Sequence, residues 1–514
     1  MASFEQIQIG SFTNSPMASP LETILNPRGI VFFGANNSVT TMGTTQLVDI
    51  LAAGYPGRIF PVHPTLDTVM GLKAYKSVKD IPTSETIDLA FIVIPARHIP
   101  AVLDECGQRG IKHAVVISAG FREIENKAAN DALIEVTRKH GIRFIGPNCI
   151  GFYNRNISWV DPAERDKKAI NTTWIPINPR NGGVSIASQS GTFACHIFIT
   201  MQKSNMGINK TISVGNEASI DLVDCLEYLE NDPTTRVIGL YIEEIKRGRE
   251  FLKVATRITK TKPIVAIYVG GTEAGARAGK SHTGAIGGND RVFNAVCKQA
   301  GIIRAMDLEE LLDYCHILDV SPVPKGDRVC ILTNAGGPGV NMSDAVERLG
   351  MKMPVFSPEF QQKLREKIQI PTAQVRNIVD LTFDVNPELM YRTLPRTLLK
   401  SDEFDAMLVY GIFGWTFYAM LEKQHPLIKI PVDDIRIMQT ALLEYYAKLP
   451  RMFNKPVIGV ALAGREDGAV VVLQDLGFPV FEMPHRAVKA LWALNERRKS
   501  LDRIAQREKT VAAT

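Results

Sequence analysis

Three times along its 514 residues, the chain passes from a short apolar segment, through a turn rich in small residues, into a helical pattern. The three turns read FGANNS at residues 33–38, ASQSGT at 187–192 and NAGGPG at 334–339. Near-continuously apolar strands that alternate with helices are typical of a parallel sheet covered by helices on both faces. Because one hydrophobic core seldom serves more than about 250–300 residues, the repetition predicts three successive doubly wound α/β domains.

Segments rich in proline and charge mark the boundaries between these domains. We expect a polar tail at 1–25, a first domain at 26–154, a connector at 155–182, a second domain at 183–320, a third domain at 321–497 and a charged tail at 498–514. The sequence NERRKSLDRIAQREK at 495–509 mixes acids with bases, and it indicates a solvated helix at the end of the chain.

Composition excludes several classes of protein. Hydrophobic residues make up 45% of the chain and charged residues 22%, which indicates a globular protein. No apolar run reaches the ~18 residues of a membrane span, and the N-terminus lacks the pattern of a signal peptide. The net charge of +5 comes without a dense basic face, and the seven cysteines form no CxxC pair. We therefore expect a cytoplasmic protein that binds neither nucleic acid nor membrane and holds no structural metal.

The first turn is a weak signal when taken alone. FGANNS has one glycine and no GxGxxG pattern, so it equally suits any tight turn between a strand and a helix. A dinucleotide-dependent dehydrogenase would carry an acidic residue after the second strand, where this chain reads PVHPT at 61–65. The sequence therefore gives the dehydrogenase hypothesis little support.

The second turn is a better place for a phosphate group. Ser190, Gly191 and Thr192 put small and hydroxyl-bearing residues at the expected N-terminus of a helix, where backbone N–H groups attract anions. An ordinary N-cap would explain the same residues, since serine and threonine are preferred there. The glycines of the third turn are likewise explained by backbone geometry alone.

Among nine histidines, His282 is the best candidate for a nucleophile. It lies in SHTGAIGG at 281–288, directly after the flexible basic stretch AGARAGK at 274–280. A histidine that accepts a phosphoryl group needs a partner to fix its tautomer, and Glu243 or Glu244 at the end of an apolar segment could serve. Alternatively, His282 lies in an ordinary surface loop and the two glutamates face water. Spacing alone does not establish that the histidine pairs with either acid.

The order of these motifs resembles that of a known family. FGANNS, IGPNCIG at 145–151, ASQSGT, SVGNEASID at 213–221, YIEEI at 241–245 and SHTGAIGG follow one another as they do in NDP-forming acyl-CoA synthetases. This is the superfamily of succinyl-CoA synthetase, and the chain is most similar to α subunits of ADP-forming acetate–CoA ligases. NAGGPG and the NIVD at 377–380 extend the resemblance into the third domain. It implies a Rossmann-like CoA-binding domain followed by two flavodoxin-like domains.

The resemblance also implies roles for individual residues. His282 would be the phosphorylated histidine, and Glu243 its supporting glutamate, with Glu244 as the alternative register. Coenzyme A would contact Gly34, Ala35, Asn36, Ser38, Ile94, Pro95, Ser118 and Asn148. Ser190, Gly191 and Thr192 would form the phosphate site.

The activity that the resemblance implies is acid + CoA + ATP ⇌ acyl-CoA + ADP + phosphate, through an acyl phosphate and a phosphohistidine. No segment resembles the family's ATP-grasp domains, so ATP, ADP and Mg²⁺ are expected on a separate ATP-grasp β subunit in an α2β2 assembly. A regulatory module that binds CoA without turnover is the alternative.

Two features depart from the family's pattern. Thr65 stands where the family often has a basic residue, which puts the anchoring of CoA's outer phosphates in question. The connector, with Trp159, Arg165, Lys167 and Lys168, is longer than expected. It would either border the acyl pocket, its positive charge then favouring a polar or anionic acid, or form a solvated loop.

Overall fold

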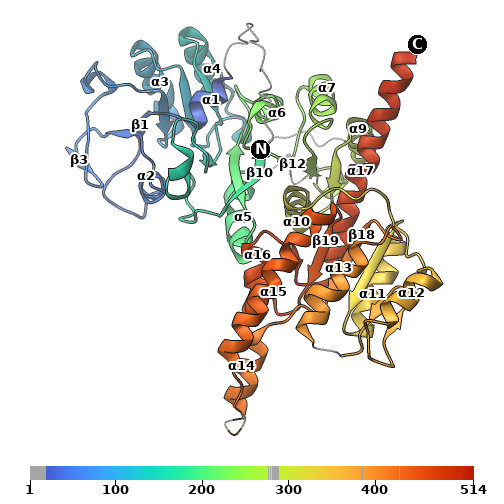
Figure 1. Cartoon of the computed structure of the whole chain (residues 1–514). Helices are drawn as coiled ribbons and strands as arrows, with labels where there is room; N and C mark the ends of the chain where they lie inside the picture. The colour runs from blue at the N-terminus through green and yellow to red at the C-terminus, as the bar shows by residue number, and fades with distance from the viewer. Residues whose placement is uncertain are drawn as a thin grey trace, which may run out of the picture.

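The computed structural model describes residues 19–275, 277, 279, 289–383, 386–425, 427 and 429–513. It shows three α/β domains in succession, each built on one large sheet, as the threefold repeat of turns predicts (Figure 1). The described residues also form a small two-stranded sheet in the first domain. No helix in these ranges is long and apolar enough to cross a membrane.

The first sheet is wholly parallel, with the strand order β2-β1-β5-β6-β7. Every residue of the central strand β1 is buried, which explains its continuous apolar run GIVFF. The elements are α1 (Pro20–Leu25), β1 (Gly29–Phe33), α2 (Met42–Ala52), β2 (Arg58–Val62), β3 (Thr68–Val69), β4 (Leu72–Lys73), β5 (Leu89–Ile92), α3 (Ile99–Gln108), β6 (His113–Val116), η3 (Arg122–Ile124), α4 (Lys127–His140) and β7 (Arg143–Ile145).

The second sheet has the order β14-β13-β12-β10-β11-β8-β9 and is mixed, because β8 and β9 pair in the antiparallel sense at its edge. These two edge strands come from the segment that follows the first sheet. The elements are β8 (Phe152–Asn154), β9 (Ile170–Asn171), β10 (Asn181–Ser188), α5 (Gly191–Lys203), β11 (Ile208–Ser213), α6 (Leu222–Asn231), β12 (Val237–Ile242), α7 (Gly248–Ile258), β13 (Ile264–Tyr268), α9 (Asp290–Ala300), β14 (Ile303–Ala305) and α10 (Leu308–Val320).

The third sheet has the order β16-β17-β15-β18-β19-β20, with one antiparallel pair, β16–β17. A hairpin of α14 and α15 extends away from it at the bottom of Figure 1. The elements are β15 (Val329–Thr333), α11 (Gly336–Arg348), α12 (Pro358–Arg365), β16 (Gln374–Val375), β17 (Val379–Asp380), α13 (Leu394–Leu399), β18 (Ala406–Tyr410), α14 (Trp415–Gln424), α15 (Val432–Phe453), β19 (Val457–Val460), α16 (Gly468–Asp475), β20 (Val480–Phe481) and α17 (Pro484–Ala513).

The long helix α17 joins the third domain to the second, as its course beside α10 in Figure 1 shows. The expectation of a solvated helix at the chain's end is correct for the helix and for its exposed last turns, but wrong for residues near 495–500. Arg497 is buried and donates to the carbonyl of Thr259, and the Ser500 hydroxyl donates to the carbonyl of Gly301 at 3.4 Å. The charged pattern hides this contact because a buried arginine that pairs with backbone looks like any surface arginine in a sequence.

An ion pair between α17 and α10 gives a test of this junction. Arg486 holds Asp313 in a bidentate pair at 2.8 and 2.7 Å, and the Asp313 side chain is only 7% exposed. Arg486→Ala leaves a buried carboxyl without its partner, so we expect the free energy of unfolding to fall by about 3 kcal/mol. Urea denaturation measures this loss.

Arg348 provides the control for that substitution. Its ion pair with Asp344 has a similar length of 2.8 Å, but its side chain is 77% exposed. Arg348→Ala should therefore cost less than about 1 kcal/mol. Equal losses in the two variants would contradict a structural role for the buried pair.

Candidate active site

A cavity of about 300 Å³ lies where the carboxyl ends of strands from the first sheet meet those of the second. In α/β proteins this end of the sheet is where ligands bind. The first domain contributes Met42, Val93, Ile117, Ser118, Ala119, Asn148, Cys149 and Ile150. The connector contributes Trp174, and the second domain contributes Gln189, Ser190, Gly191, Thr192 and Glu243. Six of the site residues predicted from the sequence line this cavity: Ser118, Asn148, Ser190, Gly191, Thr192 and Glu243.

The turn after β1 is tightly built. Gly34 has φ +98°, and a Cβ there would lie 2.1 Å from the carbonyl oxygen of Val93, so only glycine fits between the ends of β1 and β5. The Asn36 carboxamide accepts from the Ser38 N–H at 2.6 Å, and Thr44 accepts from the Asn36 N–H at 2.9 Å. The turn that contains Gly34, Ala35, Asn36 and Ser38 thus borders the carboxyl edge, but these residues do not line the cavity.

The loops after β5 and β6 are tied to one another. The Ser118 hydroxyl donates to the carbonyl of Ile94 at 2.5 Å. Ser118 lines the cavity, whereas Ile94 and Pro95 lie outside its wall. Ser118 also accepts, through its carbonyl, the N–H of Asn148 at 3.0 Å, which brings the IGPNCIG loop to the same place.

The IGPNCIG loop contacts the SVGNE loop of the second domain. Gly215 has φ +55°, and a Cβ there would lie 2.4 Å from the carbonyl oxygen of Pro147. The Asn148 amide donates to the Asn216 side chain at 3.3 Å. Cys149 is buried, and burial raises the pKa of its thiol to about 12, so this thiol is not a nucleophile at neutral pH.

The second turn opens the helix α5 with its N-terminus at the cavity. Ser190 is the N-cap residue, and its hydroxyl accepts from the Phe193 N–H at 3.5 Å. Gly191 and Thr192 form the first turn of this 13-residue helix and line the cavity. The free N–H groups and the dipole of such a helix favour an anion at this point.

The two adjacent glutamates after β12 have different surroundings. Glu243 lines the cavity beside the N-terminus of α5. Glu244 instead pairs with Arg122 of η3 in the first domain, with 3.0 Å between Oε2 and Nη2. The structure thus assigns one acid to the cavity and the other to the contact between the domains.

His282 lies outside the described residues. The segment that contains it connects β13 to α9, and β13 ends beside β12, with Tyr268 opposite Ile242. Among the described residues, no group of three or more His, Cys, Asp or Glu could hold a metal ion.

The connector reaches the cavity through a residue that sequence reasoning did not select. Trp174 lines the cavity and stacks on His196 with ring centroids 6.2 Å apart. The other aromatic and basic residues of the connector lie elsewhere: Trp159 donates to the Asn26 carbonyl at 2.9 Å, and Arg165 lines a different cavity. The connector crosses the sheet edge between these points, so its charged half and Trp174 face different ends of the strands.

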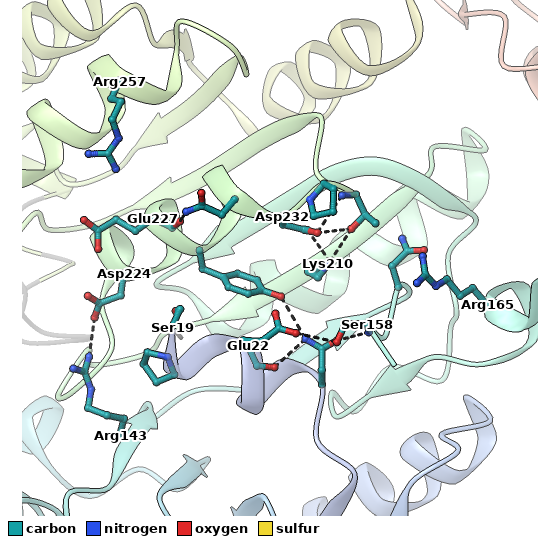
Figure 2. Close-up of a pocket in the computed structure, with 17 residues that line it drawn as sticks. Ser19, Glu22, Arg143, Ser158, Arg165, Lys210, Asp224, Glu227, Asp232 and Arg257 are labelled. Carbon is teal, nitrogen blue, oxygen red and sulfur yellow. Dashed lines mark hydrogen bonds and ion pairs between the residues drawn. The ribbon is translucent and has the colours of Figure 1, made fainter. Parts of the chain in front are cut away.

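That second cavity, of about 760 Å³, lies at the amino ends of the strands (Figure 2). Acidic and basic side chains line it in equal numbers, and several are already paired, such as Arg143 with Asp224 at 3.1 Å. Figure 2 shows this pair at one side of the pocket and Lys210 with Asp232 at the other. This cavity is larger, but it lies at the opposite end of the strands from the N-terminus of α5.

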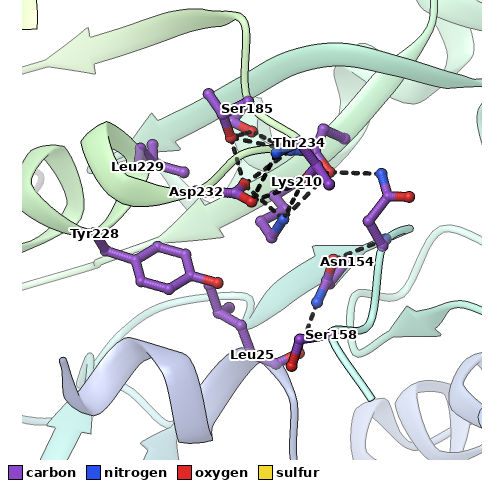
Figure 3. A network of polar contacts seen from close by, with 12 residues as sticks. Leu25, Asn154, Ser158, Ser185, Lys210, Tyr228, Leu229, Asp232 and Thr234 are labelled. Atoms are coloured by element: carbon purple, nitrogen blue, oxygen red, sulfur yellow. Dashed lines mark hydrogen bonds and ion pairs between the residues drawn. The ribbon is translucent and has the colours of Figure 1, made fainter. Parts of the chain in front are cut away.

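A buried polar network closes the inner wall of the second cavity (Figure 3). The Lys210 ammonium lies 2.7 Å from Asp232 and donates to the Thr234 hydroxyl at 3.0 Å. Burial alone would raise the pKa of Asp232, but the adjacent Lys210 lowers it to about 2. These groups satisfy one another, so the network stabilises the fold.

Comparisons with known proteins find relatives of the first two domains. Residues 28–155 match the family model of a CoA binding domain, and residues 181–318 match that of a succinyl-CoA ligase like flavodoxin domain. The α subunit of acetate–CoA ligase [ADP-forming] II from Pyrococcus furiosus is 35% identical over 94% of this chain and 98% of its own length. An acetate–CoA ligase [ADP-forming] from Methanocaldococcus jannaschii is 39% identical over 72% of this chain, but the match spans only 50% of that relative.

A solved structure extends the likeness to all three domains. The dinucleotide forming acetyl-coenzyme A synthetase 1 of Ca. Korarchaeum cryptofilum, in complex with phosphate and ADP, matches with a TM-score of 0.80 at 31% identity, over 95% of this chain and 98% of that one. The resemblance drawn from the order of the motifs is thereby confirmed. The chain belongs to the family of ADP-forming acetate–CoA ligase α subunits.

Proposed function

We propose that this chain is the α subunit of an ADP-forming acid–CoA ligase, which interconverts carboxylic acid + CoA + ATP and acyl-CoA + ADP + phosphate. The cavity supports this most directly, because it joins CoA-domain loops, the N-terminus of α5 and the Glu243 carboxylate in one place. Membership of the ligase family favours turnover over a purely regulatory CoA-binding role and over a dehydrogenase.

Three transfers account for the reaction. A ring nitrogen of His282 attacks the γ-phosphorus of ATP, and the bond to ADP breaks. A carboxylate oxygen of the acid then attacks the same phosphorus, and the electron pair of the N–P bond returns to the ring. The CoA thiol loses its proton, its sulfur attacks the acyl carbon, and the C–O bond to phosphate breaks, so inorganic phosphate leaves.

The residues of the cavity suit the last two steps. The N-terminus of α5, with Ser190, Gly191 and Thr192, would hold the phosphate group as charge develops on its oxygens. Glu243 would hold the second ring nitrogen of His282 and fix its tautomer. Coenzyme A would reach the cavity past Ser118 and Asn148, with its phosphates at the turn that contains Gly34, Ala35, Asn36 and Ser38.

The nucleotide would bind elsewhere. The match with this chain covers 98% of a relative named as an α subunit, but only 50% of the acetate–CoA ligase from Methanocaldococcus jannaschii. We propose that a separate ATP-grasp β subunit binds ATP, ADP and Mg²⁺, in an α2β2 assembly.

Replacing His282 tests the central step. In the complex with its β subunit, His282→Ala should take up no acid-labile, base-stable label from γ-labelled ATP, and acyl-CoA synthesis should fall at least about 10³-fold because the phosphoryl carrier is lost. The matched control is His425→Ala, which removes an exposed histidine of the third domain. Label that persists in His282→Ala would show the proposed function to be wrong.

The same substitution at Glu243 and at Glu244 provides a test and its control. Glu243→Gln should lower kcat by about 10²-fold, because an amide stabilises the charged ring less than a carboxylate does. Glu244→Gln should lower it by less than about 5-fold, because that side chain serves an ion pair outside the cavity. Steady-state kinetics of the complex compares the two variants, and the opposite order would assign the role to Glu244.

The described lining of the cavity also predicts the class of acid. None of its described lining residues is basic, and about 300 Å³ must hold phosphate, thiol and acyl group together. We therefore expect a small monocarboxylic acid, with kcat/KM for acetate at least about 10²-fold above that for succinate, whose second carboxylate would be buried without a partner. Trp174→Ala should improve kcat/KM for longer monocarboxylic acids, whereas preferred use of succinate would contradict the assignment.

A further inference from the structure

Gln189 makes three hydrogen bonds that the role of the second turn as a phosphate cradle does not explain. Its Oε1 accepts the N–H groups of Glu243 at 2.5 Å and of Glu244 at 3.0 Å, and its Nε2 donates to the carbonyl of Glu244 at 2.7 Å. The side chain is nearly buried, with the residue 8% exposed. We refer to these three bonds as the Gln189 clamp.

The clamp continues the sheet beyond the end of β10. In the ladder of β10 and β12, Ser188 lies opposite Tyr241, and the Gln189 N–H then donates to the Tyr241 carbonyl at 3.2 Å. The backbone of β10 turns away into α5 at this point, so it offers no hydrogen-bond partner to Glu243 and Glu244, the two residues that follow β12. The amide of Gln189 takes the place of that missing backbone, because it carries both a donor and an acceptor.

The backbone groups around Gln189 fix the orientation of its amide. Two N–H groups lie on the side of Oε1 and one carbonyl lies on the side of Nε2, so this orientation satisfies all three. Glu217 of the SVGNE motif is also buried, and its carboxyl accepts the N–H of Leu222 at 3.0 Å.

We propose that Gln189 is a positioning residue, which aims the Glu243 carboxylate at the phosphate end of the cavity. Because Ser190 and Gly191 follow it directly, one turn fixes both the anion site and the carboxylate that must act beside it. Glu244, held by Arg122, leaves Glu243 as the acid on the cavity side. This inference rests on the proposed function, in which Glu243 supports the phosphorylated histidine.

A double-mutant cycle separates positioning from general support of the fold. In the complex with the β subunit, Gln189→Leu should lower kcat by about 10- to 100-fold and leave the KM for CoA within about twofold, since the residue acts on Glu243. In a Glu243→Gln background the same substitution should cost less than about twofold, because its target is already removed. Equal losses in both backgrounds would overturn the proposal.

A second variant and a matched control guard against a folding defect. Gln189→Asn keeps the amide but is one methylene too short for the clamp, so it should show the same loss of kcat. Gln474→Leu removes an equally buried glutamine, 8% exposed, whose amide also donates to a backbone carbonyl, that of Val480 at 3.0 Å, in the third domain. It should leave kcat unchanged, and a loss equal to that of Gln189→Leu would overturn the proposal.

Amide hydrogen exchange tests whether the Gln189 clamp forms, independently of enzyme activity. The N–H groups of Glu243 and Glu244 should exchange at least about 10-fold faster in Gln189→Leu than in the wild type, and unchanged in Gln474→Leu. A wild-type complex that makes no acyl-CoA, with this faster exchange in the variant, would reject the proposed function and keep the clamp. Normal wild-type turnover with unchanged exchange would reject the clamp and keep the function.

Discussion

The structure depends on a close backbone contact between the first two domains at their carboxyl ends. The N–H of Asn216 donates to the carbonyl of Pro147 at 2.9 Å, and that of Ala218 donates to the carbonyl of Gly146 at 3.1 Å. Gly215 makes this approach feasible, because a side chain there would overlap the Pro147 carbonyl. The carboxyl ends of the two sheets are thereby held against each other, and the cavity lies between the loops that follow their strands.

Much of the fold could be predicted from local pattern, because many parallel strands, such as β1 (GIVFF) and β15 (VCILT), are apolar runs that lead into turns of small residues. The edge strands β8 and β9 could not, since they are two or three residues long and depend on distant partners: Tyr153 lies opposite Thr211 in β11. The packing of α17 was hidden for the same reason. Its buried Arg497 finds a partner in Thr259, which is far away in the sequence.

Some residues of the candidate site could likewise be predicted from the sequence, and others could not. Ser190, Gly191 and Thr192 could be selected because the chemistry of an anion site and the N-terminus of a helix coincide in one short segment. Trp174 and Gln189 could not, since a lone tryptophan among prolines and a glutamine in a turn carry no signal of their own. Their importance arises only when the connector and the end of β12 are brought beside the cavity.

The choice between Glu243 and Glu244 shows why sequence register alone is insufficient. Successive residues of a strand point to opposite faces, but that alternation fails where the strand ends and the chain turns. Here the conformation of the turn is set by Gln189, 54 residues from Glu243, and the place of Glu244 by Arg122, 122 residues away. Both constraints come from other elements, one of them from another domain. Which of the two acids faces the cavity therefore depends on contacts with distant parts of the chain, and one of these contacts forms only when the first two domains are joined.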